Sequence, residues 1–317
     1  MKLKKLFLYN LIAIICLFIA IELSSYVFLC TKYKEDIINF RKIMYPENKI
    51  NLPLISYKIA KNQSEKSLYD TLRPISYKDS KKNPIVLFGC SYTDGFGLNE
   101  NETFSFKLSE YTNRTVYNRG RSATGIPFMY HQLINKDIVN LFPKNTDVFI
   151  YTLIPDHFSR LFRYRSWIMN GDHTIKYKLN KENKLVRDKI KVPLLHTFFT
   201  SIIIEQYIEN KQTQNYENTK ALSIKLFEES YKQIKNNFDN AKFVILYIEC
   251  PLDGENIHLN YIKEFATNTN NNIVLINANE HIQDLKTNKK YWLNDDSHPS
   301  ALFWDTIIPI LSKELKL

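Results

Sequence analysis

The chain has 317 residues, 43 Lys and Arg against 33 Asp and Glu, a net charge of +10 and 44% hydrophobic residues. This length and apolar share fit one large or two small domains with a sizeable core, and the scarcity of glycine, with 7 residues, excludes a fibrous chain. The lysines are scattered and no nucleic-acid-binding motif is present, so we expect no nucleic-acid partner. The histidines and cysteines show no metal-ligand spacing, and we expect neither a metal nor a cofactor.

The N-terminus carries three lysines and then a long apolar stretch whose only charge is Glu22. A run of about 20 apolar residues spans a bilayer, and the preceding lysines favour a cytoplasmic N-terminus. We therefore predict a transmembrane anchor over residues 1–31, a stalk over residues 32–83, and a domain over residues 84–317. This topology predicts a single-pass membrane protein with the domain on the extracytoplasmic side. A cleaved signal peptide is the alternative, although no small-x-small cleavage site follows.

Beyond residue 84, short apolar runs alternate with segments of helical spacing. The apolar runs predict strands at Ile85–Phe88, Thr115–Tyr117, Asp147–Ile154, Lys242–Ile248 and Ile273–Ile276. The helical spacing predicts helices at Glu102–Tyr111, Ile126–Asn140, Ala221–Phe238 and Ala301–Leu315. The stretch from His157 to about Asn218 shows no clear pattern. Apolar strands that alternate with helices are typical of a mostly parallel sheet covered on both faces, the α/β class.

Polar residues stand directly after the predicted strands, where parallel sheets bind their ligands. Ser91 follows the first strand, Gly120 follows the second, and Asp295 and His298 precede the last helix. A serine hydroxyl becomes a good nucleophile only beside a base, and that base needs a third group to orient it. We predict that His298 and Asp295 activate Ser91. We also predict that backbone N–H groups of Ser91 and Gly120 bind the oxyanion that develops on the substrate.

Three short blocks also resemble the SGNH/GDSL hydrolase family. Gly89-Cys90-Ser91, Asn118-Arg119-Gly120 and Asp295-Asp296-Ser297-His298 resemble, in the right order, the first, second and last blocks of that family. The resemblance implies a flavodoxin-like three-layer α/β/α fold and metal-free chemistry on acyl esters of lipids or carbohydrates. Cys90 replaces the usual aspartate of the first block, a residue that lies outside the reaction path.

The third block departs further from the family. Where the family has Gly-x-Asn-Asp, with the asparagine in the oxyanion hole, this chain has Ile154-Pro155-Asp156-His157. An ionised Asp156 would repel an oxyanion, so we predict that it is protonated, turned away or replaced in its role. His157 is the predicted substitute donor, with a structural histidine as the alternative. Arg160 and Asp156 are predicted to bind substrate, Arg160 by holding an anionic group, and a solvated basic loop is the alternative.

Together these features predict a membrane-anchored serine esterase that acts on an O-acylated carbohydrate or a lipid. Two alternatives stay open. An O-acyltransferase would use the same residues, with a sugar hydroxyl instead of water accepting the acyl group. A catalytically inactive binding or assembly module would explain the missing asparagine of the third block.

Overall fold

A computed structural model describes residues 2–32, 75–78, 81–162, 175–188, 215–253, 257–268, 273–294 and 297–317. The chain divides into two compact units, and α1 (Lys2–Lys32) is the described part of the first. No helix within the described ranges is both long and apolar enough to cross a membrane. The transmembrane helix predicted for residues 1–31 is therefore not shown, and the membrane location stays a prediction.

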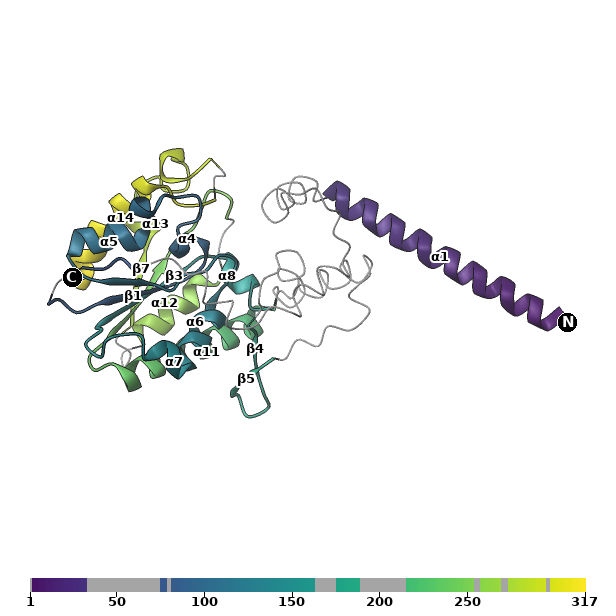
Figure 1. Cartoon of the computed structure of the whole chain (residues 1–317), viewed down its shortest axis with the longest axis horizontal. Coiled ribbons are helices and arrows are strands. Elements are labelled where there is room, and N and C mark those ends of the chain that lie inside the picture. The colour runs from purple at the N-terminus through teal and green to yellow at the C-terminus, as the bar shows by residue number, and fades with distance from the viewer. Residues whose placement is uncertain are drawn as a thin grey trace. The chain divides into compact units, whose positions relative to one another are not determined.

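A five-stranded parallel sheet forms the centre of the second unit, in the order β2-β1-β3-β6-β7 (Figure 1). The strands are β1 (Ile85–Phe88), β2 (Val116–Asn118), β3 (Val148–Leu153), β6 (Lys242–Tyr247) and β7 (Ile273–Asn277). They are rich in β-branched and aromatic side chains, which suit a pleated and buried surface. The order corresponds to the 2-1-3-4-5 arrangement of flavodoxin-like sheets. The predicted α/β class and parallel sheet are confirmed.

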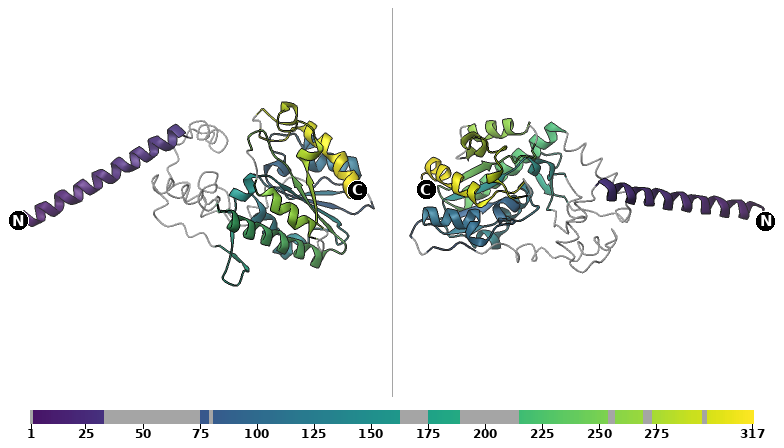
Figure 2. Two further views of the ribbon diagram at one scale, coloured as in Figure 1. Left: turned by 180° about the vertical axis from the view of Figure 1, so that it is seen from behind. Right: turned by 90° about the horizontal axis from the view of Figure 1, so that it is seen from above.

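Helices cover both faces of this sheet. One face packs against α6 (Ile126–Ile134), α7 (Lys136–Val139), α11 (Tyr216–Asn237) and α12 (Leu259–Thr267). The other packs against α5 (Phe104–Thr112), α13 (Ala278–His281) and α14 (Ala301–Leu315). Strand residues alternate between the two cores, so that Phe149 and Tyr151 of β3 face the first set while Val148 and Ile150 face the second. Figure 2 shows α14 (yellow) beside α5 (blue) on one side of the sheet.

Short elements connect these layers. They are α4 (Ser91–Asp94), η2 (Glu100–Glu102), α8 (Asp156–Ser159), η4 (Lys289–Tyr291), and an antiparallel hairpin of β4 (Tyr177–Leu179) and β5 (Leu185–Arg187). The hairpin lies in the stretch for which the sequence predicted no order. Much of the remainder of that stretch lies outside the described residues.

Two predicted helices differ from the structure, one by an internal break and one in its starting residue. The helix predicted over Ile126–Asn140 is two helices, because Asn135 has an extended backbone and its side chain accepts a hydrogen bond from the N–H of Asp137 at 3.0 Å. The helix predicted over Ala221–Phe238 starts earlier, where the Asn215 side chain caps it. Asparagine favours such caps because its side-chain oxygen satisfies a free N–H of the first turn.

Part of the predicted stalk contacts the sheet. Ser76 pairs with Val116 of β2 through two backbone hydrogen bonds of 3.0 Å. Lys78 binds Thr115, and its side chain forms an ion pair with Glu110 of α5. Residues 33–74 lie outside the described residues.

Candidate active site

Ser91 stands where β1 turns into the one-turn helix α4. The turn passes through Gly89, whose φ is +154°, and a Cβ added there would lie 2.1 Å from the Thr93 hydroxyl oxygen. Only glycine fits so close an approach in this backbone conformation. Cys90 precedes the helix as its N-cap residue, and its Sγ lies 3.9 Å from the Ser91 hydroxyl oxygen. The side chain of Ser91 is thus held at the carboxyl edge of the sheet, with 8% of the residue exposed.

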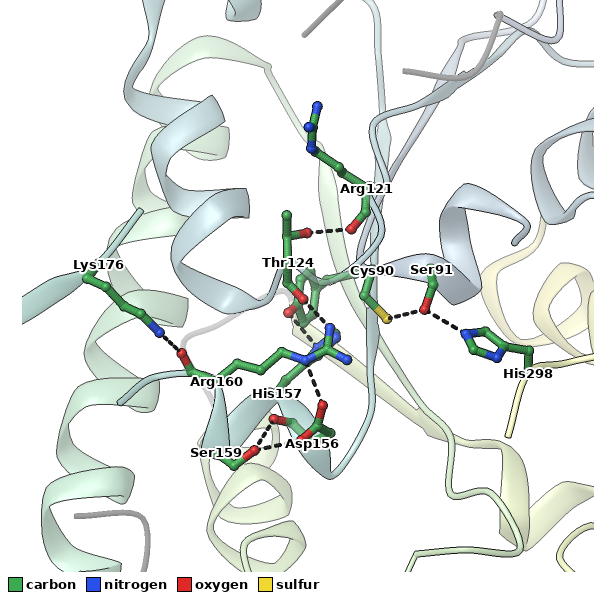
Figure 3. Close-up of polar contacts among 11 residues, drawn as sticks. Cys90, Ser91, Arg121, Thr124, Asp156, His157, Ser159, Arg160, Lys176 and His298 are labelled. Carbon is green, nitrogen blue, oxygen red and sulfur yellow. Dashed lines mark hydrogen bonds and ion pairs between the residues drawn. The ribbon is translucent and has the colours of Figure 1, made fainter. Parts of the chain in front are cut away.

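The imidazole of His298 meets this hydroxyl. Nε2 of His298 lies 3.0 Å from Oγ of Ser91, although the two residues are 207 positions apart in the chain (Figure 3). This distance is within the reach of a general base for the proton that it removes. The structure therefore brings together two of the three residues predicted for catalysis.

Backbone and ring contacts hold the His298 loop in place. The N–H of Leu293 donates to the carbonyl of His298 at 2.8 Å, and the Tyr92 hydroxyl donates to the carbonyl of Ser297. The imidazole lies beside two aromatic rings, with centroid distances of 5.6 Å to Tyr92 and 4.8 Å to Phe96. Tyr92 directly follows Ser91, so one short helix carries both Ser91 and a residue that holds the His298 loop in place. Sequence reasoning missed this second role, for which the sequence gives no separate signal.

The third predicted member of the triad, Asp295, lies outside the described residues, as does Asp296. Nδ1 of His298, the atom that the acid would contact, lies 3.1 Å from the hydroxyl oxygen of Ser297. The role of Asp295 stays a prediction.

Gly120, the predicted second oxyanion donor, lies directly against α4. A Cβ at this position would approach Thr93 Cβ to 2.6 Å and the backbone nitrogen of Asp94 to 2.7 Å. Its N–H donates to the side-chain oxygen of Asn118 at 3.0 Å, and the amide of Asn118 donates to the Thr93 carbonyl at 2.8 Å. Asn118 therefore ties the second block to the helix that starts with Ser91, while the oxyanion role of Gly120 stays a prediction.

In the third block, Asp156 forms an ion pair. Its carboxylate accepts hydrogen bonds from Nε of Arg160 at 2.7 Å and from the Ser159 hydroxyl at 2.7 Å. The positive charge of Arg160 therefore offsets the negative charge of Asp156, which we expected to repel an oxyanion. Asp156 and Arg160 were both predicted to bind substrate. In the structure they lie together and bind each other.

Arg160 is not part of a solvated loop, since only 17% of its side chain is exposed. Nη1 donates to the carbonyl of Thr124 at 2.6 Å, and Nζ of Lys176 donates to the carbonyl of Arg160. Burial lowers the pKa of Arg160, but Asp156 and, more weakly, Cys90 raise it above the ordinary arginine value. Arg160 is therefore a permanently charged, fixed group beside the site (Figure 3).

His157, the predicted substitute donor, is fully buried. Its Nδ1 lies 2.7 Å from the Tyr151 hydroxyl, and its Nε2 is buried without a hydrogen-bond partner. Burial, assisted by the nearby charge of Arg160, lowers the pKa of His157 well below its usual value. The ring is therefore neutral, and in this conformation it has no exposed surface to offer a substrate.

Other polar clusters in the described part of the chain give no sign of a metal centre. Within those residues no group of three or more His, Cys, Asp or Glu side chains could hold a metal ion. Cys90 and Cys250 are free and buried, so each acts as a small apolar residue of the core.

Comparison with known proteins finds likeness only at the level of solved structures. No family model matches the chain, and no curated protein does. A lipase from a goat rumen metagenome, Lip_vut3, is 12% identical with a TM-score of 0.47, covering 73% of this chain and 97% of its own. A protein from Desulfitobacterium hafniense, described as belonging to the G-D-S-L lipolytic family, is 13% identical with a TM-score of 0.43, covering 73% and 99%.

A family 3 carbohydrate esterase from Clostridium thermocellum is 14% identical with a TM-score of 0.42, covering 73% of this chain and 94% of its own. Similarity this distant assigns no activity.

Proposed function

We propose that this chain is a serine esterase of the SGNH/GDSL type that hydrolyses an acyl ester of a carbohydrate or a lipid. The observation that carries the proposal is the 3.0 Å contact between the Ser91 hydroxyl and the His298 imidazole. The contact lies at the carboxyl ends of parallel strands, beside the point where the strand order reverses between β1 and β3. Open α/β sheets bind their ligands in this crevice.

The geometry supports nucleophilic catalysis in two stages. Oγ of Ser91 attacks the ester carbonyl while Nε2 of His298 takes the hydroxyl proton, so that an O–C bond forms and the carbonyl electron pair moves onto oxygen. The pair then returns, the bond to the alcohol breaks, and His298 gives its proton to the departing oxygen. Water, activated by the same imidazole, attacks the acyl-enzyme and releases the acid. We assign Asp295 to orient the imidazole and to stabilise its charged form.

The resemblance of the three blocks supports an acyl ester as the bond that is cut. An acyltransferase would share the first stage and differ only in the molecule that attacks the acyl-enzyme. An inactive binding module would not require an imidazole in hydrogen-bond contact with a serine at the carboxyl ends of the strands.

A fluorophosphonate probe, which reacts covalently with activated serines, tests this proposal. We expect labelling of the wild-type protein at Ser91, none in Ser91→Ala, and a rate at least about 100-fold lower in His298→Ala, because the base contributes about 10²–10⁴-fold. The matched control is Ser122→Ala, a serine that follows the second strand and bonds Asp94 instead of a histidine, and it should label like wild type. Folded wild-type protein that does not react would overturn the proposal.

A second assay, on enzyme that has not been exposed to the fluorophosphonate, separates hydrolysis from transfer. A p-nitrophenyl acetate assay gives the rate of nitrophenol release, with and without a large excess of a soluble glycan. Release of acetate that accounts for all nitrophenol supports the esterase. Acetyl groups recovered on the glycan in preference to acetate would instead support an acyltransferase.

A further inference from the structure

We propose that the guanidinium of Arg160 is a donor of the oxyanion hole, filling the place that an asparagine side chain has in the family that the sequence blocks resemble. The inference rests on the esterase proposal and names a further residue for the same reaction. It replaces His157, which the sequence had suggested for this place.

The first support is position. Ser91 follows β1 and Arg160 follows β3 and the short helix α8, and these two strands are adjacent and parallel, with Phe88 opposite Tyr151. The ends of the strands are close, since a Cβ at Gly89 would lie 3.2 Å from Cβ of Thr152. Residues that follow the two strands therefore lie at the same edge of the sheet, at the reversal of strand order where α/β sheets bind ligands.

The second support is that Arg160 is fixed before any substrate arrives. Asp156 accepts a hydrogen bond from its Nε and the Thr124 carbonyl accepts one from its Nη1. Gly125 lies beside it, since a Cβ added at Gly125 would be 3.5 Å from the Cβ of Arg160. Thr124 in turn donates its hydroxyl to the carbonyl of Gly89 at 3.2 Å, next to the nucleophile turn. Donors that need no rearrangement during the reaction are the ones that stabilise a transition state most.

The third support is the donor that is left over. Among the described residues none hydrogen-bonds to Nη2 of Arg160, while Nε and Nη1 are both engaged. Figure 3 shows the guanidinium end pointing toward the side on which Cys90 and Ser91 lie. A charged N–H group on this side would meet negative charge that develops on the carbonyl oxygen.

The alternative donor in the same block does not reach the crevice. His157 is completely buried, and its Nδ1 contacts the Tyr151 hydroxyl. Asp156 cannot donate while it accepts from Arg160 and Ser159. Among the described residues 154–160, Arg160 is thus the one that combines positive charge, fixed orientation and an unused donor.

The test compares Arg160→Met with Arg121→Met in full-length protein. Arg121 follows β2 as Arg160 follows β3, but the side chain of Arg121 points away from Ser91 (Figure 3). With the neutral ester p-nitrophenyl acetate, we expect Arg160→Met to lower kcat about 100- to 1,000-fold with KM nearly unchanged, as for loss of an oxyanion donor. Arg121→Met should leave both values near wild type. Added guanidinium ion at millimolar concentration should restore part of the rate in Arg160→Met only.

Two further readouts separate a fold defect from a catalytic one. Asp156→Asn weakens the same ion pair but keeps every donor of Arg160, so we expect a much smaller loss of kcat than in Arg160→Met. If Arg160→Met does not fold, Arg160→Lys keeps the charge without the planar fork, and we expect it to lose at least about tenfold in kcat, because lysine cannot reproduce the geometry of the arginine.

Two results would contradict a role of Arg160 in the oxyanion hole. Wild-type kcat in folded Arg160→Met or Arg160→Lys would overturn it. So would a raised KM confined to esters that carry a carboxylate, because that result would make Arg160 a binding site for substrate charge. A wild-type protein that a fluorophosphonate does not label would instead remove the esterase proposal itself.

Discussion

His157 combines one polar partner with complete burial, and this combination decides its charge. The Tyr151 hydroxyl contacts Nδ1 at 2.7 Å, while Arg160 lies near enough to disfavour a second positive charge. A buried imidazole in such surroundings stays neutral because charging it would cost both solvation and repulsion. The residue that looked like an oxyanion donor in the sequence is therefore a neutral core residue in the fold.

This burial predicts how stability depends on pH. The folded pKa of His157 lies well below the unfolded value of about 6.5, so below that pH the unfolded chain binds a proton that the folded chain does not. Stability should thus be intact above about pH 6.5 and fall as the pH decreases, by up to about 1.4 kcal/mol per pH unit from this one group. Urea unfolding at pH 7.5, 6.5 and 5.5 measures the slope.

We expect a smaller slope in His157→Gln than in wild type. Some slope will remain, because His258 also has a pKa lowered by burial. The control His281→Gln removes an exposed histidine of α13 and should keep the wild-type slope. An unchanged slope in His157→Gln would show that this imidazole does not carry the acid sensitivity.

At the residue scale, the sequence predicted the contacts that short motifs encode. Ser91 and His298 could be paired because each stands in a block with a fixed position relative to a strand or helix. The hydrogen bond from Arg160 to the Thr124 carbonyl could not, since any residue has a carbonyl and only the path of the loop brings this one near. Arg160 and Asp156 are four positions apart, a spacing at which oppositely charged side chains on a helix can pair. The sequence could have predicted this ion pair, but both residues were predicted to bind substrate instead.

At the scale of elements, strands were easier to predict than helix ends. The buried strands are uninterrupted apolar runs, and each strand of the central sheet lies within about two residues of its prediction. The hairpin of β4 and β5 was missed because its strands have three residues each, too few to show an alternation. The break between α6 and α7 was missed because Asn135 fits a helix surface as well as a cap, and only its extended backbone distinguishes the two.

The junction of β1 and α4 depends on a glycine, which predicts a sharp mutational effect. Gly89→Ala would place a Cβ 2.1 Å from the Thr93 hydroxyl oxygen at a φ of +154°. We expect a loss of at least about 1–3 kcal/mol in the free energy of unfolding from the strained backbone alone. Because α4 must shift to relieve the contact, the rate of fluorophosphonate labelling at Ser91 should fall as well.

Gly125→Ala is the matched control for stability. Its added Cβ would meet no atom closer than 3.5 Å, and its backbone is extended, so the free energy of unfolding should change little. Urea denaturation of both variants beside wild type makes the comparison. Equal stabilities for the two variants would mean that the turn at Gly89 adapts more easily than its geometry indicates.

At the scale of the whole α/β unit, the carboxyl ends of the strands hold the candidate active site, and the amino ends hold a buried ion pair. The carboxyl edge holds Ser91, Gly120 and Arg160, with His298 reaching it from the segment before α14. The amino edge holds Arg114, whose side chain donates to the carbonyls of Asn83 and Pro84 and forms an ion pair with Asp147. No local pattern in the sequence predicts the strand order that creates both edges. The choice of neighbouring strand depends on packing across the whole sheet, and only the flavodoxin-like fold implied by the family resemblance bore on it.

Arg114 should therefore support stability without taking part in the chemistry. It joins the segments that lead into β1, β2 and β3, with 6% of its side chain exposed. Its loss leaves two carbonyls without this donor and leaves the Asp147 carboxylate with the Asn83 amide but without its ion pair. We expect Arg114→Met to lower the free energy of unfolding by roughly 2–3 kcal/mol, as for a hydrogen-bonded charge. The ion pair of Lys107 with Asp305, whose side chains are 19% and 54% exposed, gives the control, since Lys107→Met should cost less than about 1 kcal/mol. In both variants, Ser91 of the folded protein should react with fluorophosphonate at the wild-type rate, because neither change touches the carboxyl edge, and a slower reaction in folded Arg114→Met would show that the two edges are coupled.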